Sequence, residues 1–155
     1  MYTVDELNDL LIDLSFSEDI GDGDHTTLCC VPEDAMGQSQ LLIKEEGILA
    51  GIRIAKEVFH RFDPTMEVEV FIEDGTRVKP GDVAMIVTGK VRSLLQTERL
   101  MLNIMQRMSG IATMTAKYVE KLEGTGTRVL DTRKTTPGMR MLEKEAVKIG
   151  GGTNH

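Results

Sequence analysis

The sequence predicts a fold that contains both helices and strands, because helical and extended periodicities both occur along the chain. Over residues 66–72 every second residue is apolar, a pattern typical of a half-buried strand. Over residues 93–122 apolar residues recur every three to four positions, which is typical of an amphipathic helix. The chain has 155 residues, which is long enough to bury a sizeable core.

The expected elements follow one another along the chain. A helix is expected over residues 4–15, because Thr3 and Glu6 have the spacing of a capping box. A polar, glycine-rich loop is expected over residues 18–27, where the acidic spacing does not match a calcium loop. Further elements are expected as strands at 39–43, 47–50, 66–72 and 83–88, and as a helix at 51–62.

The long helical segment has two special features. Ser93 and Gln96 form a second capping-box candidate, and Ser109-Gly110 in the middle predicts a kink or a break, because Gly costs about 1 kcal/mol there relative to Ala. One face of this segment is polar. This face could contact a ligand or a partner, or it could equally be exposed to solvent. It consists of Arg99, Asn103, Gln106 and Gly110.

The charge is distributed unevenly, with a net charge of -7 overall. Residues 1–90 carry 7 Lys and Arg against 19 Asp and Glu, whereas residues 91–155 carry 11 against 6. This asymmetry suggests that anions are bound near the C-terminal part, or it is only uneven surface charge. No dense basic tract, long apolar run or signal-peptide pattern occurs, so nucleic acid and membrane partners are not expected.

The two cysteines, Cys29 and Cys30, are adjacent, and neighbouring cysteines rarely bridge because the disulfide would be strained. Reduced thiols in a cytoplasmic protein are the preferred interpretation. The spacing matches no zinc site, and no metal ligand is expected within the chain.

Residues 131–138 are the most informative segment. Arg133 and Lys134 are flanked by three threonines, between an expected short strand at 128–131 and an expected helix at 138–149 that Pro137 begins. An arginine fork, a lysine charge, hydroxyls and a helix start all suit an anion. The segment predicts a site for a multiply charged small anion; the alternative is an exposed basic turn.

Five segments in order resemble motifs of the quinolinate phosphoribosyltransferase family. They are residues 18–27, 98–103, 106–113, 131–138 and 150–155. The resemblance implies a fold of the α+β class, with an N-terminal α/β sandwich that has an open antiparallel sheet over residues 1–110, including its exit helix. It implies that residues 111–155 are the first elements of an incomplete α/β barrel. The family's enzymes are nearly twice as long, so the chain alone is expected to be inactive and prone to self-association.

The resemblance also implies a reaction and its residues. Quinolinate and 5-phosphoribosyl 1-pyrophosphate would give nicotinate mononucleotide, pyrophosphate and CO2, with Mg2+ accompanying the pyrophosphate substrate and held by residues beyond 155. Lys134 would be catalytic and, with Arg133 and Thr132, would bind substrate. His155 would line the quinolinate pocket, and Arg99 would reach the neighbouring site of a homodimer.

Two alternative functions are also consistent with parts of the sequence. A molybdenum-transport-associated paralogue shares the signature at residues 131–135. Separately, residues 73–82 resemble the hairpin of biotinyl and lipoyl carrier domains, which display a lysine on a tight turn, and Lys90 is the lysine available nearby.

Overall fold

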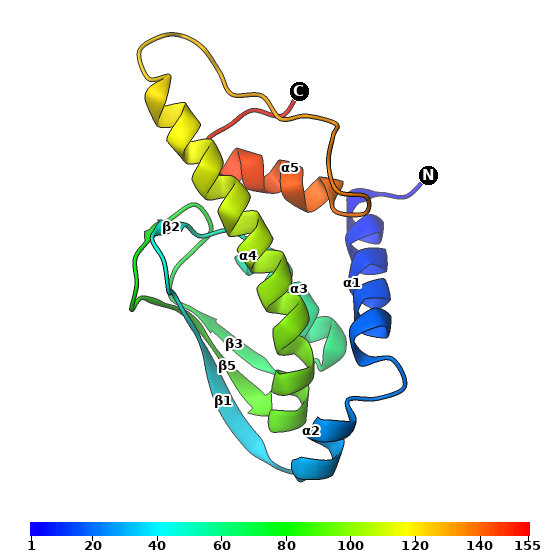
Figure 1. Ribbon diagram of the computed structural model, residues 1–155. Coiled ribbons are helices and arrows are strands. Elements are labelled where there is room, and N and C mark those ends of the chain that lie inside the picture. Colours follow the sequence, from blue (N-terminus) through cyan, green and yellow to red (C-terminus); the bar gives the residue numbers. More distant parts are fainter.

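The computed structural model describes residues 1–155 as a small antiparallel sheet and a helical layer organised around one long helix (Figure 1). The helices are α1 (Val4–Ile20), α2 (His25–Cys30), α3 (Ile52–Phe62), α4 (Val91–Lys121) and α5 (Arg140–Ile149). The strands are β1 (Met36–Leu42), β2 (Gly47–Ile48), β3 (Glu67–Val70), β4 (Arg77–Val78) and β5 (Val83–Lys90). No helix has the length and apolar character that a membrane span requires.

The main sheet is open and antiparallel, with the strand order β1-β5-β3. β1 pairs with β5 from Met36 opposite Lys90, and β3 pairs with β5 from Glu67 opposite Thr88. A separate two-stranded sheet joins β2 and β4. The predicted class, α+β with an open antiparallel sheet and without a closed barrel, is therefore confirmed.

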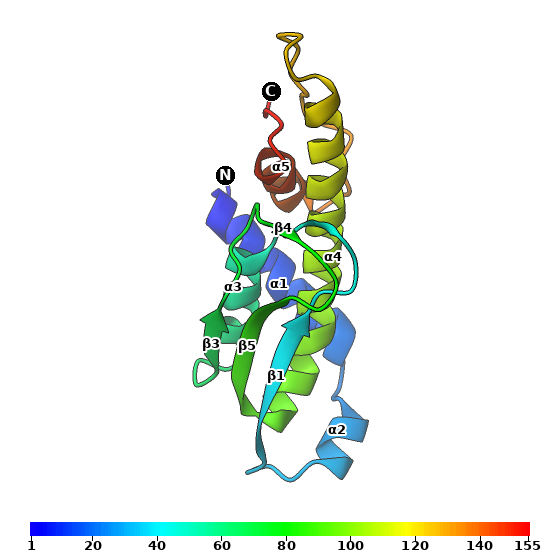
Figure 2. The ribbon, with the colours of Figure 1, turned by 90° about the vertical axis from the view of Figure 1, so that its left-hand side faces the viewer.

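Helix α4 connects the two ends of the molecule. Its N-terminal half lies against the sheet and α3, and its C-terminal half lies beside α5 and the end of the chain (Figures 1 and 2). The predicted apolar stripe is confirmed, since Met101, Met105 and Met108 are buried in the core. α3 and β5 supply much of the rest of that core.

The prediction of a loop over residues 18–27 is wrong in part, because α1 includes the start of this segment and α2 includes its end. The capping box at Thr3 is confirmed, but α1 continues to Ile20 and ends at Gly21, which has a φ of +56°. α2 begins after Asp24, whose carboxylate accepts hydrogen bonds from the amide of Thr27 at 3.2 Å and from its hydroxyl at 2.8 Å. The acidic residue that sequence reasoning placed in a solvated loop is thus a helix cap.

The predicted break at Ser109-Gly110 is also wrong, because α4 is continuous from Val91 to Lys121. The Ser109 hydroxyl accepts a hydrogen bond from the amide of Ala50 at 3.0 Å and donates one to its carbonyl oxygen at 3.1 Å. These bonds fix the middle of α4 against the chain after β2. The helix starts at Val91, so the capping box expected at Ser93 and Gln96 does not form.

Lys90 ends β5 and is the residue immediately before α4. It does not lie on a tight turn between two strands, which a biotinyl or lipoyl carrier needs. The carrier alternative is therefore wrong.

The C-terminal segment differs from the predicted strand and helix. Only Leu130 forms a bridge, and it pairs in parallel with Thr153. α5 starts at Arg140 instead of 138, because Gly138 has a φ of +80°, which is incompatible with a helix. Pro137 therefore precedes the helix and is not its first residue.

Candidate anion site on the loop before helix α5

The parallel pairing after α4 brings two sequence motifs together. The amide of Thr153 donates to the carbonyl oxygen of Val129 at 2.8 Å, and the amide of Asp131 donates to that of Thr153 at 3.0 Å. The loop that starts at Asp131 and the chain end at His155 therefore leave the same edge of this pair. In parallel architectures this carboxyl edge is where ligands bind.

The two cations of the loop are free to meet a ligand. The side chains of Arg133 and Lys134 make no hydrogen bond or ion pair, and both residues are exposed. The amide of Lys134 donates to the Thr132 hydroxyl at 3.2 Å, which closes a local turn between them. The structure thus brings Thr132, Arg133 and Lys134 together on one tight turn.

The turn is held in place by arginines that do pair. Arg140 donates to the Thr135 hydroxyl at 3.0 Å and to the carbonyl oxygen of Arg133 at 3.1 Å. Arg107 of α4 donates to the Thr136 hydroxyl at 2.6 Å and to Glu143 at 2.7 Å. The loop is therefore tied to both α4 and α5, while its own cations remain unpaired.

Glu143 accepts the hydrogen bonds that hold the loop, and it is buried, since 8% of its surface is exposed. Burial by itself would raise the pKa of Glu143, but the hydrogen bonds from Arg107 and Thr136 outweigh it, so the pKa lies below its ordinary value. Glu143 therefore stays ionised and keeps Arg107 in place.

Asp131 is the centre of a second, nearly buried cluster. Its side chain is 3% exposed and accepts a hydrogen bond from Nζ of Lys144 at 2.5 Å. It also accepts from the amide of His155 at 3.1 Å and contacts Nδ1 of that ring. The bond from Lys144, followed by those from His155, holds the pKa of Asp131 far below its ordinary value.

Arg99 lies apart from the loop. Its guanidinium pairs with Asp19 at 2.9 Å and with Asp24 at 3.3 Å, and these contacts, that with Asp19 first, raise its pKa. Arg99 precedes Arg107 by eight residues, which is about 12 Å along the axis of α4. Of the predicted site residues, Thr132, Arg133, Lys134 and His155 come from the two adjacent segments, whereas Arg99 does not join them within one chain.

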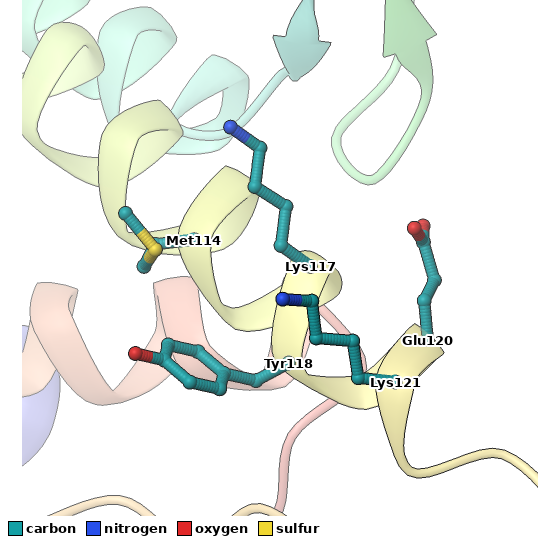
Figure 3. Close-up of a pocket in the computed structure, with 5 residues that line it drawn as sticks. All are labelled: Met114, Lys117, Tyr118, Glu120 and Lys121. Carbon is teal, nitrogen blue, oxygen red and sulfur yellow. The ribbon is translucent and has the colours of Figure 1, made fainter.

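The polar face of α4 lies partly along a groove. Gln106 and Gly110 line a hollow of about 510 Å³ between α4 and residues 41–49. A second hollow of about 380 Å³ lies near the end of α4, beside Tyr118 and Lys121 (Figure 3). None of the predicted site residues lines either hollow.

Sequence reasoning missed the residues that support the loop. A signal was present, because Arg140, Glu143 and Lys144 fall three and four positions apart and so share one face of the expected helix. Arg107 gave no such signal, since its partner Glu143 lies 36 residues away in the sequence.

Comparisons with known proteins show which family matches this chain. The model of the quinolinate phosphoribosyl transferase N-terminal domain matches residues 24–109, and that of the C-terminal domain matches residues 111–155.

The curated relatives have the same family name or its synonym. The chain is 44% identical over 146 residues to a chloroplastic nicotinate-nucleotide pyrophosphorylase (carboxylating) of Oryza sativa subsp. japonica, covering 94% of this chain and 39% of that protein. It is 43% identical over 145 residues to a probable enzyme of the same name from Bacillus subtilis, covering 94% of this chain and 50% of that protein. The chain thus spans about half the length, or less, of these relatives.

A solved structure agrees over the whole chain. NadC from Streptococcus pyogenes superposes with a TM-score of 0.93 at 40% identity, covering 100% of this chain and 55% of that one.

Proposed function

Because this chain belongs to the quinolinate phosphoribosyl transferase family, we propose that it forms part of an enzyme of NAD biosynthesis. The reaction joins quinolinate to 5-phosphoribosyl 1-pyrophosphate and yields nicotinate mononucleotide, pyrophosphate and CO2. The observation that carries this proposal is the pair of unpaired cations, Arg133 and Lys134, on a loop fixed by other arginines.

The chain's own residues would act as an electrostatic clamp. The planar fork of Arg133 suits a carboxylate or a phosphate, and Lys134 supplies a movable positive charge beside it. Thr132 offers a hydroxyl on the same turn, and His155 extends the site from the adjacent chain segment. In this proposal Lys134 is the catalytic residue, because its charge can follow the charge that develops as pyrophosphate leaves.

Magnesium would accompany the pyrophosphate substrate. No group of three or more His, Cys, Asp or Glu side chains in this chain is close enough together to hold a metal ion. In this proposal the protein ligands of the magnesium ion lie outside residues 1–155.

The two domains of the proposal share α4. Residues 1–110 would form the N-terminal sandwich, since the antiparallel sheet lies entirely within them. Residues 111–155 would start the barrel, and the parallel bridge between Leu130 and Thr153 supports this. The boundary falls inside α4, between the part that covers the sheet and the part that contacts α5.

A homodimer in which Arg99 serves the neighbouring site is part of the proposal. Its support is that Arg99 is partly exposed and lies about 12 Å along α4 from Arg107, the residue of α4 that contacts the loop. An active protein that contains this chain can test it by mixing inactive Arg99→Ala and Lys134→Ala variants. Random exchange of subunits should restore about a quarter of the wild-type activity, since half of the dimers then hold one intact site. No recovery after verified exchange would contradict action across the dimer.

A turnover assay tests the reaction. A protein that contains this chain and a completed barrel should form nicotinate mononucleotide from the two substrates, and Lys134→Ala should abolish this. The 155-residue chain alone should not turn over, so native-like turnover by it would contradict the proposed division of the site.

A cytoplasmic location also belongs to the proposal. It is supported by Cys29 and Cys30, which are exposed and free, as reduced thiols are in the cytoplasm. The rice relative is named chloroplastic, so imaging of a tagged protein in its own host is the test.

A further inference from the structure

Asp131 accepts hydrogen bonds from α5 and from the last residues of the chain. Oδ2 accepts from Lys144, and Oδ1 accepts from the His155 amide. Asn154, oriented on hydrogen-bonding grounds with its amide nitrogen inward, donates to Oδ2 at 2.8 Å and to the carbonyl oxygen of Lys144 at 3.0 Å. The carboxylate thus joins the loop, α5 and the end of the chain.

The contact with the ring of His155 determines which nitrogen carries a hydrogen. Asp131 is ionised, so its oxygens only accept, and Nδ1 must be the donor in their contact. Nζ of Lys144 lies 3.3 Å from the same Nδ1, but both atoms carry hydrogens, so neither accepts from the other. Lys144 and His155 are instead both donors to Asp131.

We propose that Asp131 is a positioning residue for substrate binding: it fixes His155 with Nδ1 as the donor and leaves Nε2 as the nitrogen that meets the substrate. The inference rests on the proposed function only in taking His155 as a substrate contact. In water a neutral imidazole is free to place its proton on either nitrogen, whereas a carboxylate partner selects one and orients the ring.

Lys144 completes the arrangement. It is 17% exposed and offsets the charge of a carboxylate that is 3% exposed. Among the contacts of Asp131, the hydrogen bond from Lys144 lowers the pKa of the carboxyl group most, whereas burial acts in the opposite direction. Lys144 therefore keeps the carboxylate an acceptor.

The first test is nitrogen NMR of the 155-residue chain with 15N-labelled histidine. At a pH where the imidazole is neutral, His155 should show a protonated Nδ1 and an unprotonated Nε2. The opposite tautomer as the main species would overturn the proposal, whether or not the protein binds quinolinate.

The second test uses Asp131→Asn, whose amide can accept or donate and so no longer selects one tautomer. We expect mixed His155 tautomers and, in a protein that binds quinolinate, binding weakened about tenfold or more, the lower end of the loss known for carboxylate partners of metal-bound histidines. Asp131→Glu should restore part of the affinity, which a loss of folding alone would not explain.

The matched control is Asp74→Asn, which removes a carboxylate that accepts from the amide of Ile52 at 2.9 Å and makes no hydrogen bond with His155. It should leave the His155 tautomer and the quinolinate affinity unchanged even if it lowers the melting temperature. Equal effects of the Asp74 and Asp131 variants on affinity would overturn the positioning role. If the wild-type protein binds no quinolinate, the proposed function fails, while the tautomer measurement still decides the role of Asp131.

Discussion

Among individual residues, the cationic side chains of the site are of two kinds. Some are paired and hold the loop in place, whereas others have no partner. Arg107 and Arg140 are bound to Glu143, Thr135, Thr136 and the backbone. Arg133 and Lys134 have no such partner. The sequence could predict that the basic loop exists, but not which cations pair, because this depends on contacts with α4 and α5.

This division makes Arg133→Met a test that separates binding from stability. The substitution should change the free energy of unfolding by less than about 0.5 kcal/mol, because an exposed, unpaired side chain stabilises little. It should weaken quinolinate binding at least tenfold. Lys148→Met, on the exposed side of α5, removes the same charge and should leave binding unchanged. Chemical denaturation and calorimetry measure both effects, and a large loss of stability in Arg133→Met would show that the cation has a structural role.

Glu143 gives the fold a dependence on acid. Its folded-state pKa lies below the ordinary value of 4.5, so its contribution to stability is present above that pH and is lost as the pH falls through the folded value. The melting temperature of the wild type should therefore fall as the pH drops from 5 to 3. Glu143→Gln should melt lower at pH 7 but lose less over this acid range. Parallel curves for the two proteins would contradict the ion pair with Arg107.

Among the elements, two glycines have opposite roles: Gly110 lies within α4, and Gly150 packs against it. A Cβ on Gly150 would overlap the carbonyl oxygen of Ala112 and lie 2.8 Å from Cβ of Thr115. A Cβ on Gly110 would meet no atom within 4 Å. The sequence pattern showed a glycine inside a helix and a triple glycine at the end, but not that only the second marks a close approach of two segments.

Replacing each of these two glycines by alanine should change the stability of the protein in opposite directions. Gly150→Ala should destabilise the protein by roughly 1–3 kcal/mol, because the C-terminal segment must move away from α4. Gly110→Ala should stabilise it by about 0.5–1 kcal/mol, because alanine is the better helix former. Denaturant unfolding of the two variants checks this, and destabilisation by both would mean that Gly110 also accommodates a neighbour.

The extent of the helices could also be predicted from the sequence only in part. The capping box at Thr3 is a local signal and was predicted correctly. In the middle of the continuous helix α4, Ser109 bonds to Ala50, a residue 59 positions away, and local propensity does not contain that contact.

At the scale of the whole molecule, apolar side chains remain exposed on more than one helix. On α1 Leu14 is 68% exposed, and on α4 Tyr118 is 58% exposed, while Leu130 is 60% exposed on the way to the loop. Such surfaces favour association. Sedimentation velocity of the chain should therefore show concentration-dependent oligomers, and a monomer at all concentrations would contradict this.

We propose that the loop at residues 131–137, together with His155, binds the dicarboxylate quinolinate. Calorimetric titration of a complete protein that contains this chain tests it most directly. We expect saturable binding of quinolinate and weaker binding of a pyridine with a single carboxylate. Binding should be lost in Arg133→Met but not in Lys148→Met. No detectable binding of quinolinate to the folded wild-type protein would contradict the claim and would return the molybdenum-transport-associated paralogue as the alternative.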